Sequence, residues 1–428
     1  MRYKGMAEEN DKTLQTLHRE LIDQVKAKGH ITSHRVEAAL RAIPRHLFLP
    51  DVAPQVVYQD RAIITKTVDG RFVSSSSQPT IMAIMLEQLD LHKGQRVLEI
   101  GAGTGYNAAL MAHIVGETGH VVTIDIDEDI VENARAHLAA AGYKRVQVVC
   151  ADGGSGFPAA APYDRIILTV NAGDITPAWH EQLTADGRLL LPLSVRGPQL
   201  AVAFKRVGTH FESVSIQPCG FVGLRGAFAE QGLQVQLAAE EGLVYLIPGE
   251  QHAIDAEVVK QWLHTPAQDI ATLVYVRIQE LFSGLTFWLA LHEPQFCSLI
   301  VQRAAIERGI VPNLFPLLGD VPTYNTIGIL GQKALSMLTY TVEDVKSSVP
   351  ALSEGIPHSS PVRLIVRTFG DDSELAHHLV SLLETWDKAG RPNEQKLHIH
   401  AYVSGDTFIP AQQDIVLKRQ WTHFVFRW

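Results

Sequence analysis

The sequence predicts an α/β protein: a Rossmann-like, mostly parallel, doubly wound sheet followed by a C-terminal α+β module. Strand and helix patterns alternate from Val97 to about Leu191, which is typical of parallel strands joined by helices on both faces of a sheet. A glycine-rich turn directly follows the strand expected from Arg96 to Ile100. Near the C-terminus, Val362 to Phe369 alternates as a strand and Ser373 to Lys388 as an amphipathic helix.

Length and charge limit the classes of protein to consider. A chain of 428 residues exceeds one typical domain, so we expect two or three units with their own cores. The formal net charge of −9 and the lack of a long basic cluster argue against a nucleic-acid partner. No apolar run reaches the roughly 18 residues that span a bilayer, and the charged start lacks a signal peptide's apolar core. We therefore expect a cytoplasmic protein without a membrane partner.

The cysteines and histidines lack the spacing of metal ligands. The three cysteines are far apart: Cys150, Cys219 and Cys297. Their odd number and wide separation argue against a disulfide framework or a zinc site. The pairs His377/His378 and His398/His400 fit solvated helix or strand positions better than metal ligands. We assign no metal.

The first 90 residues combine helix signals with a polar segment. Apolar spacing in residues 12–28 predicts an amphipathic helix, and Ser33 is placed to cap a second helix from Arg35 to Ile43. A serine run leads from Ser74 to Pro79 and precedes a third helix, Thr80 to Leu89. By spacing alone, the serines fit an elaborate helix cap better than a functional segment.

The segment from Glu99 to Tyr106 has the chemistry of a ligand-binding turn. Glycines at Gly101, Gly103 and Gly105 let the backbone bend sharply and let a ligand approach main-chain N–H groups at the start of the next helix. Dinucleotide-binding folds use the spacing G-x-G-x-x-G instead, and Glu99 would repel a pyrophosphate but could accept hydrogen bonds from an ammonium group. The alternative is a turn that only packs a helix against a strand.

Two acids follow the next two expected strands. The strand His120 to Ile126 contains Asp125, about 20 residues after the turn, where Rossmann-like folds place the acid that binds ribose hydroxyls. The strand Val146 to Cys150 precedes Asp152, which could meet an adenine amino group. Glycine turn, ribose acid and adenine acid in this order resemble class I S-adenosylmethionine-dependent methyltransferases.

A longer pattern, from about Leu14 to Ala229, resembles the protein-L-isoaspartate O-methyltransferases. It consists of a helical prefix with R-x-x-F-x-P, then Y-x-D, a serine-rich segment ending in S-x-P, the glycine turn, and D-G-G-S-G. Two departures lie on the expected substrate side. Thr80 replaces the histidine or tyrosine of many members, and Gly223 replaces the proline of F-V-P-L.

The resemblance implies an enzyme that transfers a methyl group from S-adenosylmethionine to a carboxylate and releases S-adenosylhomocysteine. Ser77, with Ser75 and Ser76 nearby, matches the serine that lies beside the acceptor carboxylate. We expect no general base, because a carboxylate is already nucleophilic at neutral pH and alignment can supply most of the acceleration. The expected cofactor contacts are Glu99, Gly101, Gly103, Thr104, Gly105, Tyr106, Asp125, Ile126, Asp152 and Gly153. The expected substrate contacts are Tyr58, Gln78, Pro79 and Val222.

The second half of the chain extends beyond this pattern. Leu200 to Lys205 and Phe211 to Ile216 predict an antiparallel hairpin at the edge of the sheet, and we expect a catalytic domain at residues 1–230 and a C-terminal module at 231–428. The motifs W-L-A-L and W-D-x-A-G-R-P resemble a subset of isoaspartyl methyltransferase homologues associated with ribosomally synthesised and modified peptides, especially lanthipeptides.

Three functional hypotheses follow. The leading one is a tailoring enzyme that methylates an aspartate in a cyclised precursor peptide, giving a succinimide (aspartimide) and then isoaspartate. The second is an enzyme that repairs isoaspartyl sites in damaged proteins. The third is a cofactor-binding protein without turnover. In the tailoring hypothesis the C-terminal module recognises the peptide, and Phe287 or Trp288 contributes to that surface; burial in the module's own core is the alternative for both.

Overall fold

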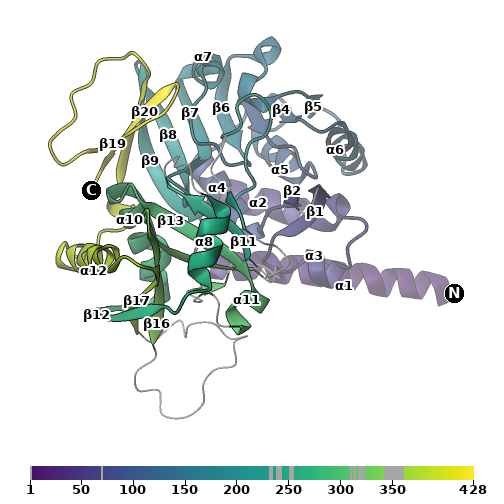
Figure 1. Cartoon of the computed structure of the whole chain (residues 1–428). Helices are drawn as coiled ribbons and strands as arrows, with labels where there is room; N and C mark the ends of the chain where they lie inside the picture. The colour runs from purple at the N-terminus through teal and green to yellow at the C-terminus, as the bar shows by residue number, and fades with distance from the viewer. Residues whose placement is uncertain are drawn as a thin grey trace.

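Two large sheets lie side by side in the computed structural model (Figure 1). The structure describes residues 2–68, 71–230, 235–237, 243–249, 255–308, 311, 315–316, 323–341 and 361–428. The first sheet has the strand order β19-β20-β18-β9-β8-β7-β6-β3-β4-β5 among these residues. In that order, the bounds are Ile415–Lys418, Thr422–Arg427, His398–Val403, His210–Cys219, Gln199–Val207, Leu183–Ser194, Tyr163–Leu168, Arg96–Ile100, His120–Asp125 and Gln147–Cys150.

The strands β7, β6, β3, β4 and β5 form the parallel part of this sheet, and helices cover it on both faces. Side chains alternate between the faces, so Val97 lies in one apolar core and its neighbour Leu98 in the other. This arrangement confirms the predicted Rossmann-like, doubly wound class. The helices of this half are α1 (Arg2–Ala27), α2 (His34–Ala42), η1 (Arg45–Phe48), α3 (Pro54–Val57), α4 (Pro79–Leu89), α5 (Tyr106–Val115), α6 (Glu128–Ala140), η2 (Gly153–Ser155), η3 (Pro158–Ala160) and α7 (Pro177–Gln182).

The serine run lies in a separate two-stranded hairpin. Strand β1 (Ile63–Val68) pairs antiparallel with β2 (Arg71–Ser76), which contains the first three serines. Gln78 occupies the N-cap position of α4, and its side chain makes no capping hydrogen bond. The serines are therefore not the cap of α4, which was the alternative from spacing.

The last three strands return to the first sheet. Strands β8 and β9 form the expected antiparallel hairpin, but β18 pairs with β9, so this hairpin lies inside the sheet and not at its edge. Strand β20 then pairs with β18, and β19 with β20. The edge prediction was wrong because the partner of β9 comes from a segment almost 200 residues further along the chain. A boundary at residue 230 therefore does not separate the two sheets.

The second sheet is antiparallel and is built from the segment between β9 and β18. Its described strands follow the order β10 (Val235–Gln236), β11 (Leu243–Pro248), β13 (Phe296–Gln302), β15 (Thr323–Leu330), β16 (Ala334–Thr341), β17 (Val362–Gly370) and β12 (Gln268–Val276), with β14 (Phe315–Pro316) beside β15. The helices of this segment are α8 (Ala256–Leu263), α9 (Ile278–Glu280), η5 (Leu281–Leu285), α10 (Thr286–His292), α11 (Arg303–Glu307), α12 (Ser373–Lys388) and η6 (Glu394–Lys396).

Helix α10 joins the two sheets through their cores. Phe287 packs into the core of the first sheet, and the adjacent Trp288 packs into the core of the second. Only 3% of Phe287 and 4% of Trp288 is exposed. The structure thus corrects the hypothesis that these two rings form part of a peptide-binding surface, and supports burial.

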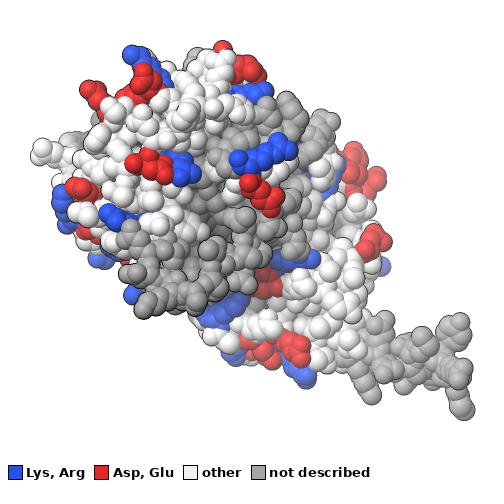
Figure 2. All heavy atoms as spheres, turned by 60° about the horizontal axis from the view of Figure 1, so that its bottom comes forward, with Lys and Arg blue, Asp and Glu red and all other residues white. Residues whose placement is uncertain are grey.

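None of the described helices combines the length and the apolar character required to cross a bilayer. On the face shown in Figure 2, Lys and Arg side chains lie next to Asp and Glu side chains. Arg367, on β17, and Asp269, on β12, form an ion pair 2.7 Å apart on the second sheet. Opposite charges therefore offset one another locally on this face.

Candidate active site

Main-chain hydrogen bonds to β4 hold the glycine turn between β3 and α5 in place. The amides of Gly101 and Ala102 both donate to the carbonyl of Ile124, at 2.8 and 3.0 Å. Gly101, Gly103 and Gly105 all have positive φ angles, of 103°, 49° and 85°. A Cβ on Gly101 would lie 2.5 Å from the hydroxyl of Thr169, so that position has no room for a side chain. The turn is therefore fixed by its own backbone against the ends of β4 and β6.

Glu99 lies behind this turn, fully buried. Its two carboxylate oxygens accept hydrogen bonds from Asn107 Nδ2 and from the Thr123 hydroxyl, each at 2.7 Å. Burial raises the pKa of Glu99 to about 7, against the lowering effect of these two hydrogen bonds. In this arrangement the carboxylate braces the start of α5 against β4, and its contact with an ammonium group stays a prediction.

Asp125 stands at the end of β4, beside the turn. Its carboxylate accepts a hydrogen bond from the amide of Gly103 at 3.2 Å and a longer one, at 3.4 Å, from the amide of Asp127. Only 10% of the side chain is exposed, and burial raises the pKa of Asp125. A desolvated carboxylate with remaining acceptor capacity at the end of a parallel strand suits a pair of ribose hydroxyls.

Asp152, at the end of β5, is covered by a segment that the sequence did not place there. It accepts from the amide of Gly154 at 2.9 Å, and its second oxygen accepts from the amide of Ala227 at 2.7 Å. Gly226 has a φ of 93°, and a Cβ on it would lie 2.3 Å from this carboxylate. Residues 225–228 thus lie across the carboxyl ends of the parallel strands.

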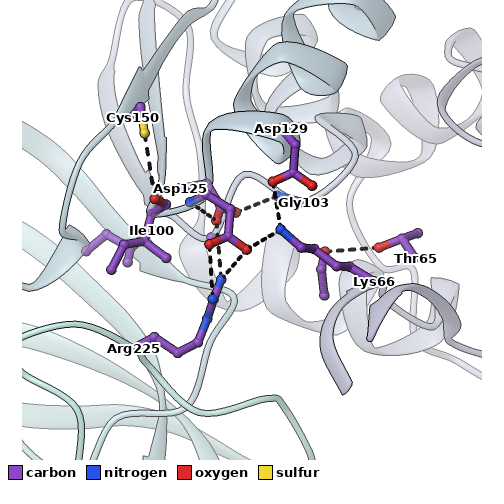
Figure 3. A network of polar contacts seen from close by, with 12 residues as sticks. Thr65, Lys66, Ile100, Gly103, Asp125, Asp129, Cys150 and Arg225 are labelled. Carbon is purple, nitrogen blue, oxygen red and sulfur yellow. Dashed lines mark hydrogen bonds and ion pairs between the residues drawn. The ribbon is translucent and has the colours of Figure 1, made fainter. Parts of the chain in front are cut away.

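Two cations, Lys66 and Arg225, point toward the carboxylates beside Asp125 (Figure 3). Both pair with Asp127, the second residue after β4. Both terminal nitrogens of Arg225 donate hydrogen bonds to the Asp127 carboxylate, at 3.1 and 2.9 Å. Lys66, from strand β1 of the serine hairpin, lies 2.8 Å from the same carboxylate and 2.7 Å from Asp129. The serine hairpin and the 225–228 segment are therefore both attached to Asp127, two residues after Asp125.

The serine segment is anchored by Arg45, only 1% of which is exposed. Its Nη2 donates to the carbonyls of Ser76 and Ser77 at 3.2 and 3.0 Å, and to the Ser76 hydroxyl at 3.2 Å. Its Nη1 donates to the carbonyl of Val57 at 2.7 Å. Burial lowers the pKa of Arg45 to about 10, so the guanidinium remains charged at neutral pH. Arg45 thus fixes the main chain immediately before α4.

Asp60 fixes the other side of the same segment. It accepts from the amide and the hydroxyl of Thr80, at 2.9 and 2.7 Å, and its main-chain carbonyl accepts from Gln78 Nε2 at 3.1 Å. Pro79, buried at the first position of α4, has no N–H to satisfy there. Thr80, the departure noted in the sequence, therefore belongs to the capping arrangement of α4.

Two aromatic residues expected at the site have buried side chains. Tyr58 is 7% exposed, and its hydroxyl lies 2.5 Å from His46 Nδ1, inside the helical prefix. Tyr106 is 5% exposed, its ring is tilted against that of Phe48, and its hydroxyl donates to the carbonyl of Ile43 at 3.3 Å. The contacts expected of Tyr58 with the substrate and of Tyr106 with the cofactor stay predictions. The hydroxyl of a tyrosine can find a hydrogen-bond partner inside a core, and sequence spacing does not reveal this.

The remaining expected residues lie around the turn and the strand ends. Thr104 accepts from His137 Nδ1 at 3.1 Å through its carbonyl, and Gly153 accepts from Trp179 Nε1 at 2.9 Å in the same way. Ile126 Cδ1 lies 3.0 Å from the position of a Cβ on Gly226. Val222 accepts from the amide of Asn171 at 2.8 Å. These contacts surround the carboxyl edge of the parallel strands.

Sequence reasoning missed three residues that shape this region. Arg45 carried a signal, since it is the first residue of the R-x-x-F-x-P pattern. Lys66 and Arg225 carried none, because their partner Asp127 is 61 and 98 residues away in the chain. Their role depends on the tertiary fold alone.

The chain shares extended sequence similarity with known proteins. The family model described as protein-L-isoaspartate(D-aspartate) O-methyltransferase matches residues 15–228. A protein named protein-L-isoaspartate O-methyltransferase from Hyperthermus butylicus is 38% identical over 219 residues, covering 49% of this chain and 89% of that relative. The protein of the same name from Methanoculleus marisnigri is 39% identical over 209 residues, covering 49% and 91%. A solved structure with that name aligns with a TM-score of 0.48 and 23% identity over 90% of this chain and 96% of its own.

The strand ends also fit the cofactor that the sequence predicted. Asp125 offers a desolvated acceptor beside the turn, where its carboxylate accepts from the amide of Gly103 at 3.2 Å. S-adenosylmethionine is accordingly the cofactor, and the chain belongs to the protein-L-isoaspartate(D-aspartate) O-methyltransferase family.

Proposed function

We propose that the chain methylates the free α-carboxylate of L-isoaspartyl residues in proteins or peptides. One observation carries this proposal beyond family membership: the carbonyl of Ser75 lies 3.6 Å from the position of a Cβ on Gly103. The segment expected to hold the acceptor carboxylate thus abuts the turn expected to hold the cofactor. Methyl transfer requires that proximity, because the reacting atoms must approach to about 3–3.5 Å.

The reaction is a displacement in which a carboxylate oxygen forms a bond to the methyl carbon while the bond from carbon to sulfur breaks. The bound cofactor supplies the methyl group and takes the electron pair on its sulfur. The protein holds the acceptor: we propose that the hydroxyl of Ser77 donates a hydrogen bond to the carboxylate, with Ser75, Ser76 and Gln78 flanking it. Arg45 positions this hydroxyl by binding the Ser77 carbonyl at 3.0 Å. No base is required, since the attacking carboxylate carries no proton at neutral pH.

A pair of isomeric peptides tests the proposal. The full chain is incubated with S-adenosylmethionine and either an isoaspartyl peptide or its ordinary aspartyl isomer, and formation of S-adenosylhomocysteine is followed. We expect turnover with the isoaspartyl peptide and a rate near background with its isomer, because only the former carries an α-carboxylate on the branch that the serine segment would hold. Equal rates with both peptides would contradict the proposed substrate.

The tailoring hypothesis remains a second candidate. It is favoured by the large sheet between β9 and β18, which lies outside the family match at residues 15–228. The relatives favour the isoaspartyl substrate instead, so we rank that substrate first. A cyclised lanthipeptide-type precursor with one aspartate separates the two hypotheses. Faster methylation of that aspartate than of the isoaspartyl peptide would reverse the ranking, and its product would be a methyl ester that can close to a succinimide.

A further inference from the structure

A histidine-rich cluster on the outer face of the first sheet is unrelated to the methyl-transfer site. His210 and Glu212 are two residues apart on β9, so their side chains share one face. His400, on β18, is the direct cross-strand partner of Glu212. The two strands come from the two halves of the chain, and the fold alone brings these three residues together.

The three side chains present donor atoms at nearly the spacing of a metal site. Glu212 Oε1 lies 3.1 Å from His210 Nε2 and 3.8 Å from His400 Nδ1. All three donor atoms lie within 4.8 Å of one another. Ligands bound to one tetrahedral ion at about 2.0–2.2 Å are separated by about 3.4 Å. Small side-chain rotations are therefore enough to close the cluster around an ion.

The ring of His400 is prepared for such a role. Its Nδ1 is buried and makes no hydrogen bond within the described residues, although it faces the Glu212 carboxylate. Arg427, which lies near the cluster, is paired with Asp414 at 2.7 Å, and this pairing offsets its charge there.

Aromatic contacts fix the orientation of the His210 imidazole. The ring of Tyr402 stacks on His210 with centroids 5.0 Å apart and an interplanar angle of 16°. The ring of Phe408 in turn stacks on the ring of Tyr402, with centroids 4.7 Å apart. A ligand ring held in one plane loses little conformational entropy on binding, which favours a formed site over an accidental pair of surface histidines.

We propose that His210, Glu212 and His400 bind one divalent transition-metal ion, such as Zn²⁺, which fastens β18 to β9. Two imidazoles and one carboxylate suit zinc, nickel, cobalt or copper, whereas magnesium and calcium prefer oxygen ligands. Water would fill the remaining coordination positions. The ion stabilises the folded chain by mass action, because the three ligands converge only when the C-terminal strands have joined the first sheet.

The test is a calorimetric titration of the full chain, without a histidine tag and freed of metal, with ZnCl₂. We expect one ion per chain and a higher midpoint of thermal unfolding with zinc. His400→Gln and Glu212→Gln should each weaken zinc binding by at least about tenfold, since even residues that only hydrogen-bond to a metal ligand contribute that much. His398→Gln is the matched control, because His398 is exposed on the same strand and lies outside the cluster.

Two outcomes would overturn the proposal: no saturable binding by the parent chain, or equal affinities in the parent, His400→Gln and Glu212→Gln. Circular dichroism confirms that each variant is folded before titration. Cobalt provides a second readout, because an ion held by these ligands gives a visible absorption band, which should be present in the parent and in His398→Gln and lost in His400→Gln.

Discussion

Among single substitutions, one at Asp125 should lower cofactor affinity most directly. We predict that Asp125→Ala lowers affinity for S-adenosylhomocysteine by about 10- to 150-fold, the equivalent of losing a hydrogen bond to a charged group worth about 1.5–3 kcal/mol. Calorimetric titration measures this. Asp129→Ala is the control, because Asp129 is largely exposed and only pairs with Lys66. An unchanged affinity in the Asp125 variant would remove that residue from the site.

Ser77 should act on the acceptor and not on the cofactor. We predict that Ser77→Ala reduces the rate of methyl transfer to an isoaspartyl peptide while affinity for S-adenosylhomocysteine stays at the parent value. The reason is that the hydroxyl orients the carboxylate, and misalignment lowers the population of reactive geometries. Ser74→Ala, in strand β2 three residues before Ser77 and hydrogen-bonded to Thr65, serves as control. Parent-level turnover in Ser77→Ala would contradict the role of the serine.

Glu99 should make stability depend on pH. Its folded-state pKa is raised to about 7 by burial, above the ordinary value of 4.5, so the folded state binds the proton more tightly than the unfolded state. The contribution to stability is therefore full below about pH 4.5 and is lost as pH rises through about 7, by up to roughly 3 kcal/mol. Urea unfolding of the parent and of Glu99→Gln across this range measures it. We expect the difference between the two to change with pH; a constant difference would contradict the raised pKa.

At the scale of elements, Arg225 and Lys66 attach the 225–228 segment and the serine hairpin to Asp127. We predict that Arg225→Ala speeds dissociation of S-adenosylhomocysteine by up to about fivefold, since a partly exposed ion pair contributes about 0.2–1 kcal/mol. Stopped-flow displacement measures the rate, and added salt should reduce the difference. Arg367→Ala, which removes an arginine of similar exposure from the second sheet, should leave the rate unchanged. A slower or unaltered rate in Arg225→Ala would show that the pair does not control access.

The parallel half of the fold was predictable because its signals are local. Alternating apolar residues, a glycine turn and an acid at each strand end all lie within short stretches, and each acts through its own backbone. Asp125 and Asp152 were located for this reason. The burial of Tyr58 was not predictable, since it depends on His46 and His18 reaching the ring from other helices. The covering segment was missed for the same reason, because Gly226 and Ala227 meet Asp152 only in three dimensions.

At the scale of the whole molecule, the C-terminal strands belong to the core of the first sheet. Phe424 is fully buried and lies with its ring centroid 6.5 Å from that of Phe204 on β8. We predict that Phe424→Ala destabilises the whole chain by about 3–5 kcal/mol, as is usual for a large cavity. Urea unfolding followed at the cofactor site measures this. Ile409→Ala, at a side chain that is 95% exposed, should change stability little. If Phe424→Ala lowered the stability of the second sheet alone, the two sheets would unfold separately.

The return of the chain to its first sheet also affects how it is made. The amide of Ile399 binds the hydroxyl of Ser213, and these residues are 186 positions apart. At a translation rate of about 5–20 residues per second, β9 leaves the ribosome roughly ten to forty seconds before β18 can pair with it. During that interval the nascent chain carries an open strand edge, which is a site for mispairing with neighbouring chains. Synthesis of this enzyme therefore places its greatest demand on chaperones after the cofactor half has emerged and before the final thirty or so residues have followed.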